Sequence, residues 1–498
     1  MQKIHLTKEP STEAKHLAFS YQVEAVNAIK DMEYAAIFHE QGLGKSKIAI
    51  DLMLYWLTKK QVDTVVILTK KSLLNNWKNE LESHTFLKPK TLTVDKGKNY
   101  NIFNGPYRVI LCNFELIISE KERFKLFQKT RSVAIIIDES AKIKNPDSTI
   151  TKALIDIADG FTKRIIMTGT PVANRPYDIW SQIYFLDHGD SLGTSFSEFK
   201  RNADLTNNLA VSSDKRQAFE DCIQSIFNKI SRFTVRETKN SGVITLPDKK
   251  YHQIFTEWEQ YQLDLYNQIR DELKAYVIKD NKAVIDESDD ILKRLLRLVQ
   301  VASNPQLVDE SYDQQPGKIN AIESLLSDIT GASEKAIVWT CFTQNVDWLA
   351  NHFSHYKAVR VHGKMNMEDR NRSIDHFKND STVKLLVATP AAAKEGLTLT
   401  VANHVIFFDR GFSLDDYLQA QDRIHRISQT KVCHVYNLIM KDSIDEWVDI
   451  LLNSKHTAAQ LAQGDIEYET YRKTMDYSFG DVIRGVLLSP DEGGTSID

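Results

Sequence analysis

The segment QGLGKS, residues 41–46, has the residue types and spacing to bind a nucleotide phosphate group. It follows an apolar run and precedes an amphipathic stretch, so the expected order is strand, turn, helix. Backbone N–H groups of such a turn, with the helix dipole, face a phosphate. Lys45 would then neutralise the β- and γ-phosphates, and the Ser46 hydroxyl would bind magnesium. The pattern GxxxxGK[ST] fails at its first glycine, where His39 stands, and a chance match in a turn is the alternative.

The run VAIIIDES, residues 133–140, carries two adjacent carboxylates, Asp138 and Glu139. Acidic side chains at the carboxyl end of an apolar strand are typical of ligand sites in α/β sheets. Asp138 would hold magnesium, and Glu139 would orient or deprotonate the attacking water. The alternative is a solvated acidic pair. Two further strand candidates separate the pair from the phosphate loop, and this order favours the catalytic interpretation.

A third group of charged side chains lies in QAQDRIHRISQ, residues 419–429. Arg423 and Arg426 are three residues apart on an expected helix, and would therefore share one face. Two fixed guanidinium groups can grip the oxygens of a transferring phosphoryl group. A solvated face or an ion-pair network is the alternative for this segment alone.

These side chains need strands and helices to position them. Short β-branched runs alternate with amphipathic stretches of helix length, which predicts buried parallel strands. The first series of expected strands covers residues 65–69, 109–113, 133–138 and 164–170, and the second covers 336–340, 384–390, 405–409 and 435–439. A mostly helical stretch lies between the series. The sequence therefore predicts an α/β fold with two doubly wound parallel sheets, helical insertions and an amphipathic helix over residues 442–464.

Composition excludes several classes of protein. Hydrophobic residues make up 42% and charged residues 26% of the chain, which is ordinary globular usage and excludes disorder, collagen and coiled coil as the main structure. Lys+Arg 63 against Asp+Glu 67 gives a net charge of −4, although a neutral body can still hold a basic groove. The four cysteines form no CxxC pair, so neither a zinc site nor a disulfide framework is expected. No apolar run approaches the roughly 18 residues of a membrane span, and no signal-peptide core is visible. We expect a soluble intracellular protein.

Taken in chain order, six segments resemble the motif series of Swi/Snf-type ATPases, the branch of superfamily-two helicases that translocates on double-stranded DNA. They are YQ (21–22), QGLGKS (41–46), DESAKIKN (138–145), TGTPVAN (168–174), EGLTLT (395–400) and QAQDRIHRISQ (419–429). Two further stretches, residues 68–81 and 296–308, also resemble family segments, and the similarity covers roughly residues 17–455. The resemblance implies tandem RecA-like lobes. The expected domains are an ATP-binding lobe at 1–245 with a helical insertion at about 186–235, a second lobe at 246–440 with an insertion at about 255–310, and a brace helix with a short acidic tail at 441–498.

The resemblance also implies roles for individual residues, with ATP and magnesium as cofactors. Tyr21 and Gln22 match the adenine-recognising element, and a Gln amide can pair with the N6/N7 edge of adenine. The remaining matches are Gly42, Gly44, Lys45 and Ser46 to the phosphate loop; Asp138 and Glu139 to the magnesium and water pair; Thr168, Gly169 and Thr170 to the element that couples hydrolysis to lobe movement; Arg423 and Arg426 to arginine fingers; and Gln419 to the glutamine that opens the final motif.

For the DNA track, the resemblance points to Lys71, Ser72 and Trp77 in the first lobe. In the second lobe, Thr340 and Thr389 sit at expected strand ends. Hydroxyls, backbone N–H groups and helix N-termini can grip phosphates without reading sequence. The alternatives are ordinary loop-end hydroxyls and, for Trp77, a core aromatic side chain.

Three departures from the family pattern stand out. Ala141 replaces the histidine of DEAH or DESH, which helps to link the γ-phosphate to the coupling element. The second-lobe motif reads AAAKEGLTLT, nearer to the annealing-helicase branch, and the proline of the usual CPxSLLxxW segment is absent. Because Glu139 remains, we expect ATPase activity with weakened or rewired coupling.

The resulting hypothesis is an ATP-driven translocase on double-stranded DNA, working in replication, repair, recombination or phage–host defence. Alternatives are a strand-separating or strand-annealing helicase, a restriction-type motor subunit, an RNA-dependent ATPase, and a hydrolysis-deficient DNA-binding scaffold. We expect a monomer in the cytoplasm, either at a nucleoid or in a phage-infected bacterium. The acidic tail beyond residue 464 and the helical insertions are possible contacts for a protein partner.

Overall fold

The computed structural model describes residues 10–172, 175–203, 213–242, 244, 246–279, 289–392, 398–463 and 465–466. Within them, the chain divides into two compact units. The first contains the chain up to Ala203, Glu220–Ile244 and Ala462–Asp465, and the second contains Thr245–Leu461 together with the described residues of Asp204–Phe219 and Ile466.

The first unit is built on a seven-stranded sheet in which every pairing is parallel. In spatial order the strands are β3 (Lys90–Thr91), β4 (Val109–Asn113), β2 (Thr64–Thr69), β5 (Val133–Asp138), β6 (Lys163–Met167), β1 (Tyr34–Ile37) and β7 (Thr234–Val235). The apolar runs expected at 65–69, 109–113 and 133–138 are confirmed as strands, and the run expected at 164–170 forms a strand only as far as Met167. The strands β2, β4 and β6 are buried along their full length, as parallel strands with two covered faces should be.

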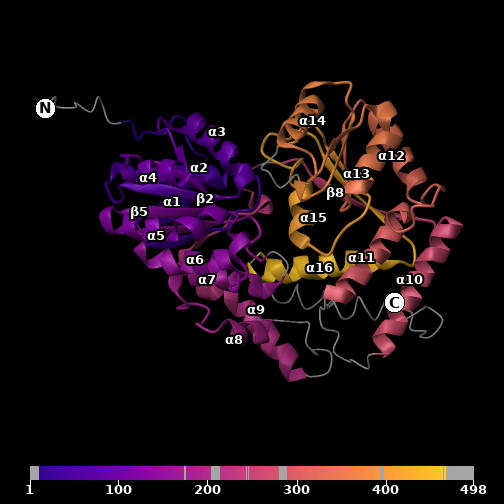
Figure 1. Cartoon of the computed structure of the whole chain (residues 1–498), viewed down its shortest axis with the longest axis horizontal. Helices are drawn as coiled ribbons and strands as arrows, with labels where there is room; N and C mark the ends of the chain where they lie inside the picture. The colour runs from indigo at the N-terminus through magenta and orange to yellow at the C-terminus, as the bar shows by residue number, and fades with distance from the viewer. Residues whose placement is uncertain are drawn as a thin grey trace. The chain divides into compact units, whose positions relative to one another are not determined.

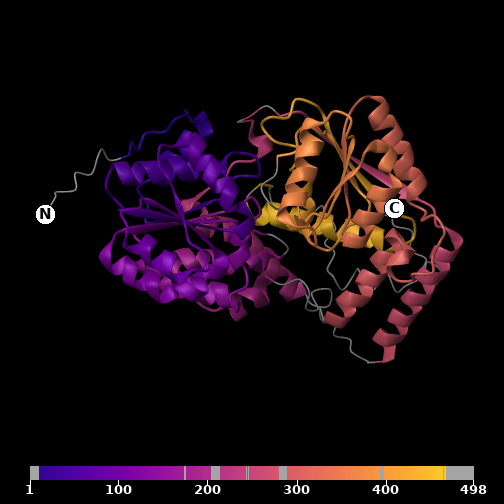
Figure 2. The same ribbon diagram turned by 45° about the horizontal axis from the view of Figure 1, so that its top comes forward.

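Helices cover both faces of this sheet (Figures 1 and 2). They are α1 (Ser20–Ile29), α2 (Lys45–Thr58), α3 (Leu74–His84), α4 (Lys96–Asn104), α5 (Phe114–Thr130), α6 (Thr149–Ile157) and α7 (Trp180–Asp187). Helices α8 (Phe196–Ala203) and α9 (Ser213–Ile230) follow α7 in the chain. Side chains of α1, α2 and α3 pack with β2, β4, β5 and β6 in one apolar core. Local capping fixes where helices start; for example, Asn113 accepts a hydrogen bond from Leu116 N at the start of α5.

The second unit has a six-stranded sheet, again with only parallel pairings. Its order is β10 (Val359–Val361), β11 (Leu385–Ala388), β9 (Ala336–Trp339), β12 (His404–Phe407), β13 (Cys433–Met440) and β8 (Lys249–Thr256). The second series of expected strands is therefore confirmed. Together the two sheets confirm the predicted fold class, two doubly wound α/β lobes.

Two apolar cores lie on opposite faces of the second sheet. Helix α14 (Met367–Asn379) and residues at the end of α15 (Leu414–Gln421) pack on one face, and α12 (Ile319–Gly331) and α13 (Thr343–His352) pack on the other. The unit also contains α10 (Gln260–Lys279), α11 (Asp289–Ser303) and α16 (Ile444–Ala462). The helix predicted over residues 442–464 is α16. It is held within the second unit by Asp449, which pairs with Arg410 and accepts from Gln253.

Within the described part of the chain, no helix is both long and apolar enough to cross a bilayer. The tail beyond residue 466 lies outside the described residues, as do residues 173–174 and 393–397 of two motif segments.

Candidate nucleotide-binding site

The phosphate loop connects β1 to α2 in the predicted strand–turn–helix order. Gly42 and Gly44 have φ angles of 88° and 70°, in the left-handed region that favours glycine. A Cβ on Gly44 would also lie 2.3 Å from the Gln22 Nε2 atom. The backbone angle therefore favours glycine at position 44, and a side chain there would displace the Gln22 amide.

The ammonium group of Lys45 lies over the beginning of this loop. Its Nζ donates to the carbonyl oxygens of His39 at 3.0 Å and Glu40 at 3.4 Å. A Cβ on Gly169, which follows β6, would lie 3.2 Å from the same Nζ. Because β6 is the neighbour of β1 in the sheet, the loop lysine and the predicted coupling segment lie together at one edge.

The predicted acidic pair stands at the end of β5, on the other side of β6. The Asp138 carboxylate accepts hydrogen bonds from Trp77 Nε1 at 2.8 Å and Thr69 Oγ1 at 3.2 Å. Burial, and then the charge of Glu139, raise the pKa of Asp138 to about 6, while Trp77, Lys45 and Thr69 oppose the shift. Glu139 has a φ of 54°, a strained angle for a residue with a side chain and one that often marks a functional site.

The residues around Asp138 fit a magnesium ion. A desolvated carboxylate beside a second carboxylate carries negative charge that a divalent cation would stabilise. Ser46 lies in the first turn of α2, at the same edge of the sheet. Magnesium is usually held by one or two carboxylates together with substrate phosphates. It does not need the larger clusters of metal-binding side chains, which the described residues lack.

Tyr21 and Gln22 are both 3% exposed and hold the phosphate loop from the side of α1. Both side chains bond the Leu43 carbonyl: Tyr21 Oη at 3.1 Å and Gln22 Nε2 at 3.3 Å. Gln22 Oε1 accepts from Phe19 N at 3.0 Å. Burial is the main cause that raises the pKa of Tyr21. The Gln22 amide thus supports the loop in this structure, and adenine recognition by Gln22 stays a prediction.

The predicted coupling residues are buried where β6 ends. Thr168 is fully buried and Thr170 is 7% exposed. Thr168 N donates to the Ile37 carbonyl at 3.2 Å, and Thr168 Oγ1 accepts from Thr170 N at 3.2 Å. The ends of the three strands β1, β6 and β5 thus bring the loop lysine, the coupling segment and the acidic pair to one edge of the first sheet.

Sequence reasoning missed a segment that backs the phosphate loop, Thr234–Lys239. Arg236 Nη1 donates to the Phe38 carbonyl at 2.5 Å, Glu40 N donates to the Glu237 carbonyl at 2.9 Å, and Lys239 N donates to Glu40 Oε2 at 2.8 Å. Arg236 also forms an ion pair with Asp465. The only sequence signal was a run of alternating charges far from the loop in the chain, which does not identify a contact.

The five predicted DNA contacts differ in exposure. Lys71 is exposed and Ser72 is partly exposed, on the 3₁₀ turn that precedes α3. Trp77 is 1% exposed and donates to Asp138, as the core-aromatic alternative expected. Thr340 is fully buried and donates to Asp409 at 2.5 Å. Thr389 is also buried, at 5% exposed, but it lines a pocket. We therefore keep Lys71, Ser72 and Thr389 as proposed DNA contacts.

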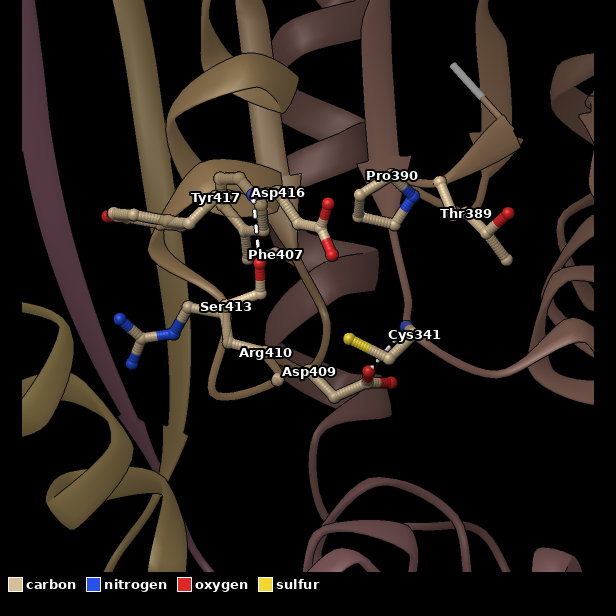
Figure 3. A pocket seen from close by; sticks show the side chains of 11 residues that line it. Cys341, Thr389, Pro390, Phe407, Asp409, Arg410, Ser413, Asp416 and Tyr417 are labelled. Carbon is tan, nitrogen blue, oxygen red and sulfur yellow. Dashed lines mark hydrogen bonds between the residues drawn. The ribbon is translucent and has the colours of Figure 1, made fainter. Parts of the chain in front are cut away.

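Thr389 lines a pocket at the carboxyl ends of β9, β11 and β12 in the second unit (Figure 3). The cavity holds about 100 Å³, room for a few water molecules. At its floor, the Asp409 carboxylate accepts from Thr340 Oγ1, from Cys341 N at 2.7 Å and from Ser303 Oγ at 2.9 Å. Burial raises the pKa of Asp409. The Asn345 amide donates to the same carboxylate at 3.4 Å, so its four donors among the described residues are all uncharged.

The prediction that Arg423 and Arg426 share one face of a helix is wrong. Helix α15 ends at Gln421, and both arginines lie in the turn that follows. The Arg423 carbonyl accepts from Leu399 N at 2.9 Å, so it takes no part in a helical ladder. Arg423 is 2% exposed, and Arg426 donates to Thr398 Oγ1 at 2.8 Å.

Gln419 is also buried and donates to Asp415 Oδ1 at 2.7 Å. Gln419, Arg423 and Arg426 all belong to the second unit. Their meeting with a nucleotide bound at Lys45 therefore stays a prediction.

Two parallel α/β sheets, with a glycine loop and an acidic pair at one edge of the first, define a two-lobed nucleotide-hydrolase fold. Comparisons with known proteins agree: the family description "SNF2-related domain" matches residues 21–307, more than half of the chain. "Helicase conserved C-terminal domain" matches residues 317–428. The chain belongs to the SNF2 family.

The individual relatives share less than a third of their aligned residues with this chain. An uncharacterized ATP-dependent helicase of Mycoplasma genitalium is 29% identical over 87% of this chain and 41% of its own length. The ISWI chromatin-remodeling complex ATPase ISW1 of Saccharomyces cerevisiae is 25% identical over 86% of this chain and 39% of its own length. The chain thus spans about two fifths of these relatives. Among solved structures, the Sulfolobus solfataricus SWI2/SNF2 ATPase core in complex with dsDNA is 26% identical over 95% of this chain and 99% of its own, with a TM-score of 0.43.

Proposed function

We propose that this chain is an ATP-dependent motor that translocates on double-stranded DNA without reading its sequence. The observation that carries the proposal is the assembly of Lys45, Asp138 and Glu139 at one edge of the first sheet. Lys45 supplies positive charge at the phosphate loop. The raised pKa of Asp138 shows that its charged form is disfavoured, and a bound cation would stabilise that form. This set of groups is the one that phosphoryl transfer to water requires.

The proposed chemistry assigns one task to each side chain. The phosphate loop and Lys45 bind and orient the β- and γ-phosphates. Ser46 and Asp138 would hold magnesium, which supplies charge neutralisation at the phosphates when bound. Glu139 orients the attacking water and accepts its proton.

The second unit would supply the remaining positive charge. Arg423 and Arg426 are proposed as arginine fingers, with Gln419 beside them. Fingers contribute about 10³–10⁵-fold in rate in other phosphoryl-transfer enzymes. Hydrolysis would then be slow until the two lobes close on ATP, and each closure would advance the lobes along the DNA backbone. Contacts to phosphates by Lys71, Ser72 and Thr389 would make binding indifferent to sequence and strongly dependent on salt.

The test is phosphate release by the purified chain with no nucleic acid, single strands, blunt duplex, forked duplex and RNA. We expect stimulation by blunt duplex and little by RNA. Arg423→Ala and Arg426→Ala should each remove the stimulation and leave nucleotide affinity nearly unchanged. Unchanged stimulation in both variants would contradict the finger assignment.

A strand-separating or strand-annealing helicase is the second candidate. Strand displacement on forked DNA would indicate a helicase, whereas triplex displacement on blunt duplex without strand displacement would indicate pure translocation. A hydrolysis-deficient scaffold is the candidate of another class, and any turnover that Lys45→Ala abolishes would exclude it. A monomer in the cytoplasm, with a protein partner at the helical insertions or the acidic tail, completes the proposal.

A further inference from the structure

Helix α7 touches two segments that the proposed reaction uses. One is the turn Ser140–Ile143, directly after Asp138 and Glu139. The other is the stretch that begins at Pro171, directly after the coupling residues 168–170. One side chain of α7, Gln182, bonds both.

Gln182 uses the two ends of its amide for the two segments. Ser140 Oγ donates to Gln182 Oε1 at 2.7 Å. Gln182 Nε2 donates to the Pro171 carbonyl at 2.8 Å and to the Asp178 carbonyl at 2.9 Å. The path from the acidic pair to the coupling segment therefore consists of one hydroxyl and one amide.

This path is completely buried. Ser140 and Gln182 are both 0% exposed, so water cannot replace a lost partner. The neighbouring Ser181 hydroxyl donates to the Ile143 carbonyl, which pins the far end of the same turn to α7. Since α7 holds the turn at both ends, a displacement of the turn must move α7 or break these bonds.

We propose that Gln182 is a positioning residue that transmits a change in the position of Glu139 to the coupling segment 168–170. It would take over the linking role of the family histidine, which Ala141 replaces in this chain. The inference deepens the proposed function and rests on ATP hydrolysis at this site. A shift of Glu139 toward the attacking water would pull Ser140. The amide of Gln182 would carry that shift to the Pro171 carbonyl and so to Thr170.

The test compares Ser140→Ala, Gln182→Leu and the double variant in the full chain, with ATP turnover measured with and without duplex DNA. Each single variant should lower the DNA-stimulated kcat by about tenfold, the scale of one buried hydrogen bond. The KM for ATP should stay within about twofold, because the phosphate loop is untouched. The double variant should be no slower than the slower single variant, because both changes cut one path.

The matched control is Gln128→Leu, which removes a Gln amide that donates to the Ile157 carbonyl at 2.9 Å in the same unit. We expect it to leave the stimulated kcat unchanged. Ser140→Ala is the smaller change and keeps the test valid where Gln182→Leu fails to fold. The proposed link through Gln182 would be overturned if the losses of rate in the two single variants multiplied in the double variant. It would also be overturned if the single variants folded and kept wild-type stimulation by DNA. If the wild-type chain showed no ATP turnover, the proposed function would be overturned, and the proposed role of Gln182 with it.

Discussion

Two aspartates, the half-buried Asp138 and the buried Asp409, stand at comparable places in the two sheets. Each follows or ends a buried strand at the carboxyl edge, and burial raises the pKa of each. Asp409 accepts from two hydroxyls, one backbone N–H and the Asn345 amide, all of which are uncharged. Asp138 accepts from Trp77 and Thr69, while Glu139 adds a second carboxylate beside it.

The difference shows that a buried carboxylate at a sheet edge is not by itself a catalytic signal. Around Asp409 the contacting residues donate hydrogen bonds, so the carboxylate organises loops of the protein. Around Asp138 the two donors do not balance the negative charges of Asp138 and Glu139, so this pair of carboxylates can bind a cation. The surrounding donors and charges therefore separate a structural aspartate from a functional one.

The largest effect is expected from the acidic pair of the first sheet. Glu139→Gln keeps the size of the side chain and removes the base, so ATP turnover should fall by about 10²–10⁴-fold, the usual contribution of a general base. ATP should remain bound in this variant, measured by equilibrium titration. Lys45→Ala should also abolish turnover, and here ATP binding should weaken. Persistent turnover in Glu139→Gln would contradict the assignment.

The second effect concerns stability and separates the two aspartates directly. Asp409→Ala removes the acceptor of four hydrogen bonds, and we expect the free energy of unfolding to fall by about 3 kcal/mol. Asp138→Ala should cost less than half of that, because it also removes repulsion from Glu139. Urea unfolding measures both, and ATP titration should show unchanged affinity for Asp409→Ala. Equal losses of stability would remove the distinction.

A smaller effect is expected at Trp77. Trp77→Phe removes the indole N–H from Asp138, which should raise the pKa of Asp138 further and lower ATP turnover about tenfold, the scale of a hydrogen bond to a charged group. Its affinity for duplex DNA should not change. Trp56→Phe is the control, because the fully buried Trp56 donates to the Lys30 carbonyl at 2.7 Å instead. Loss of DNA affinity without loss of turnover would restore Trp77 to the DNA track.

The smallest effect is a dependence of stability on pH at the same edge. Burial, with the charges of Lys45 and Arg236, lowers the pKa of His39 from 6.5 to about 4. Between these values the unfolded chain binds a proton that the folded chain does not, so stability falls as pH falls. We expect His39 to contribute a loss of about 1 kcal/mol between pH 7 and pH 5.5. Urea unfolding of His39→Asn should show a correspondingly shallower dependence, and identical slopes would contradict this role.

Much of the fold follows from the sequence, because parallel strands buried on two faces read as apolar runs. Strands β3 and β7 have two residues each, and β10 has three, too few to show any pattern. Strand β8 lies at the edge of its sheet, and its mixture of exposed and buried positions hides it among polar segments.

The site was predictable where local backbone geometry decides it, as in the turn with Gly42 and Gly44. It was not predictable where distant segments meet. Trp77 and Asp138 are 61 residues apart, and only the fold reveals their bond. The helix expected through Arg423 ends early because the carbonyl of that residue pairs with Leu399, a contact that no pattern in the segment announces.

The short strand β7 has a consequence for how the chain folds during its synthesis. His39 and Val235, which it brings into contact, are separated by 196 residues of chain. A ribosome that adds about 5–20 residues per second needs roughly 10–40 s to cover that distance. Throughout this interval the nascent phosphate loop has no backing strand, so a newly made chain acquires its fully supported loop only after most of the first lobe has left the exit tunnel.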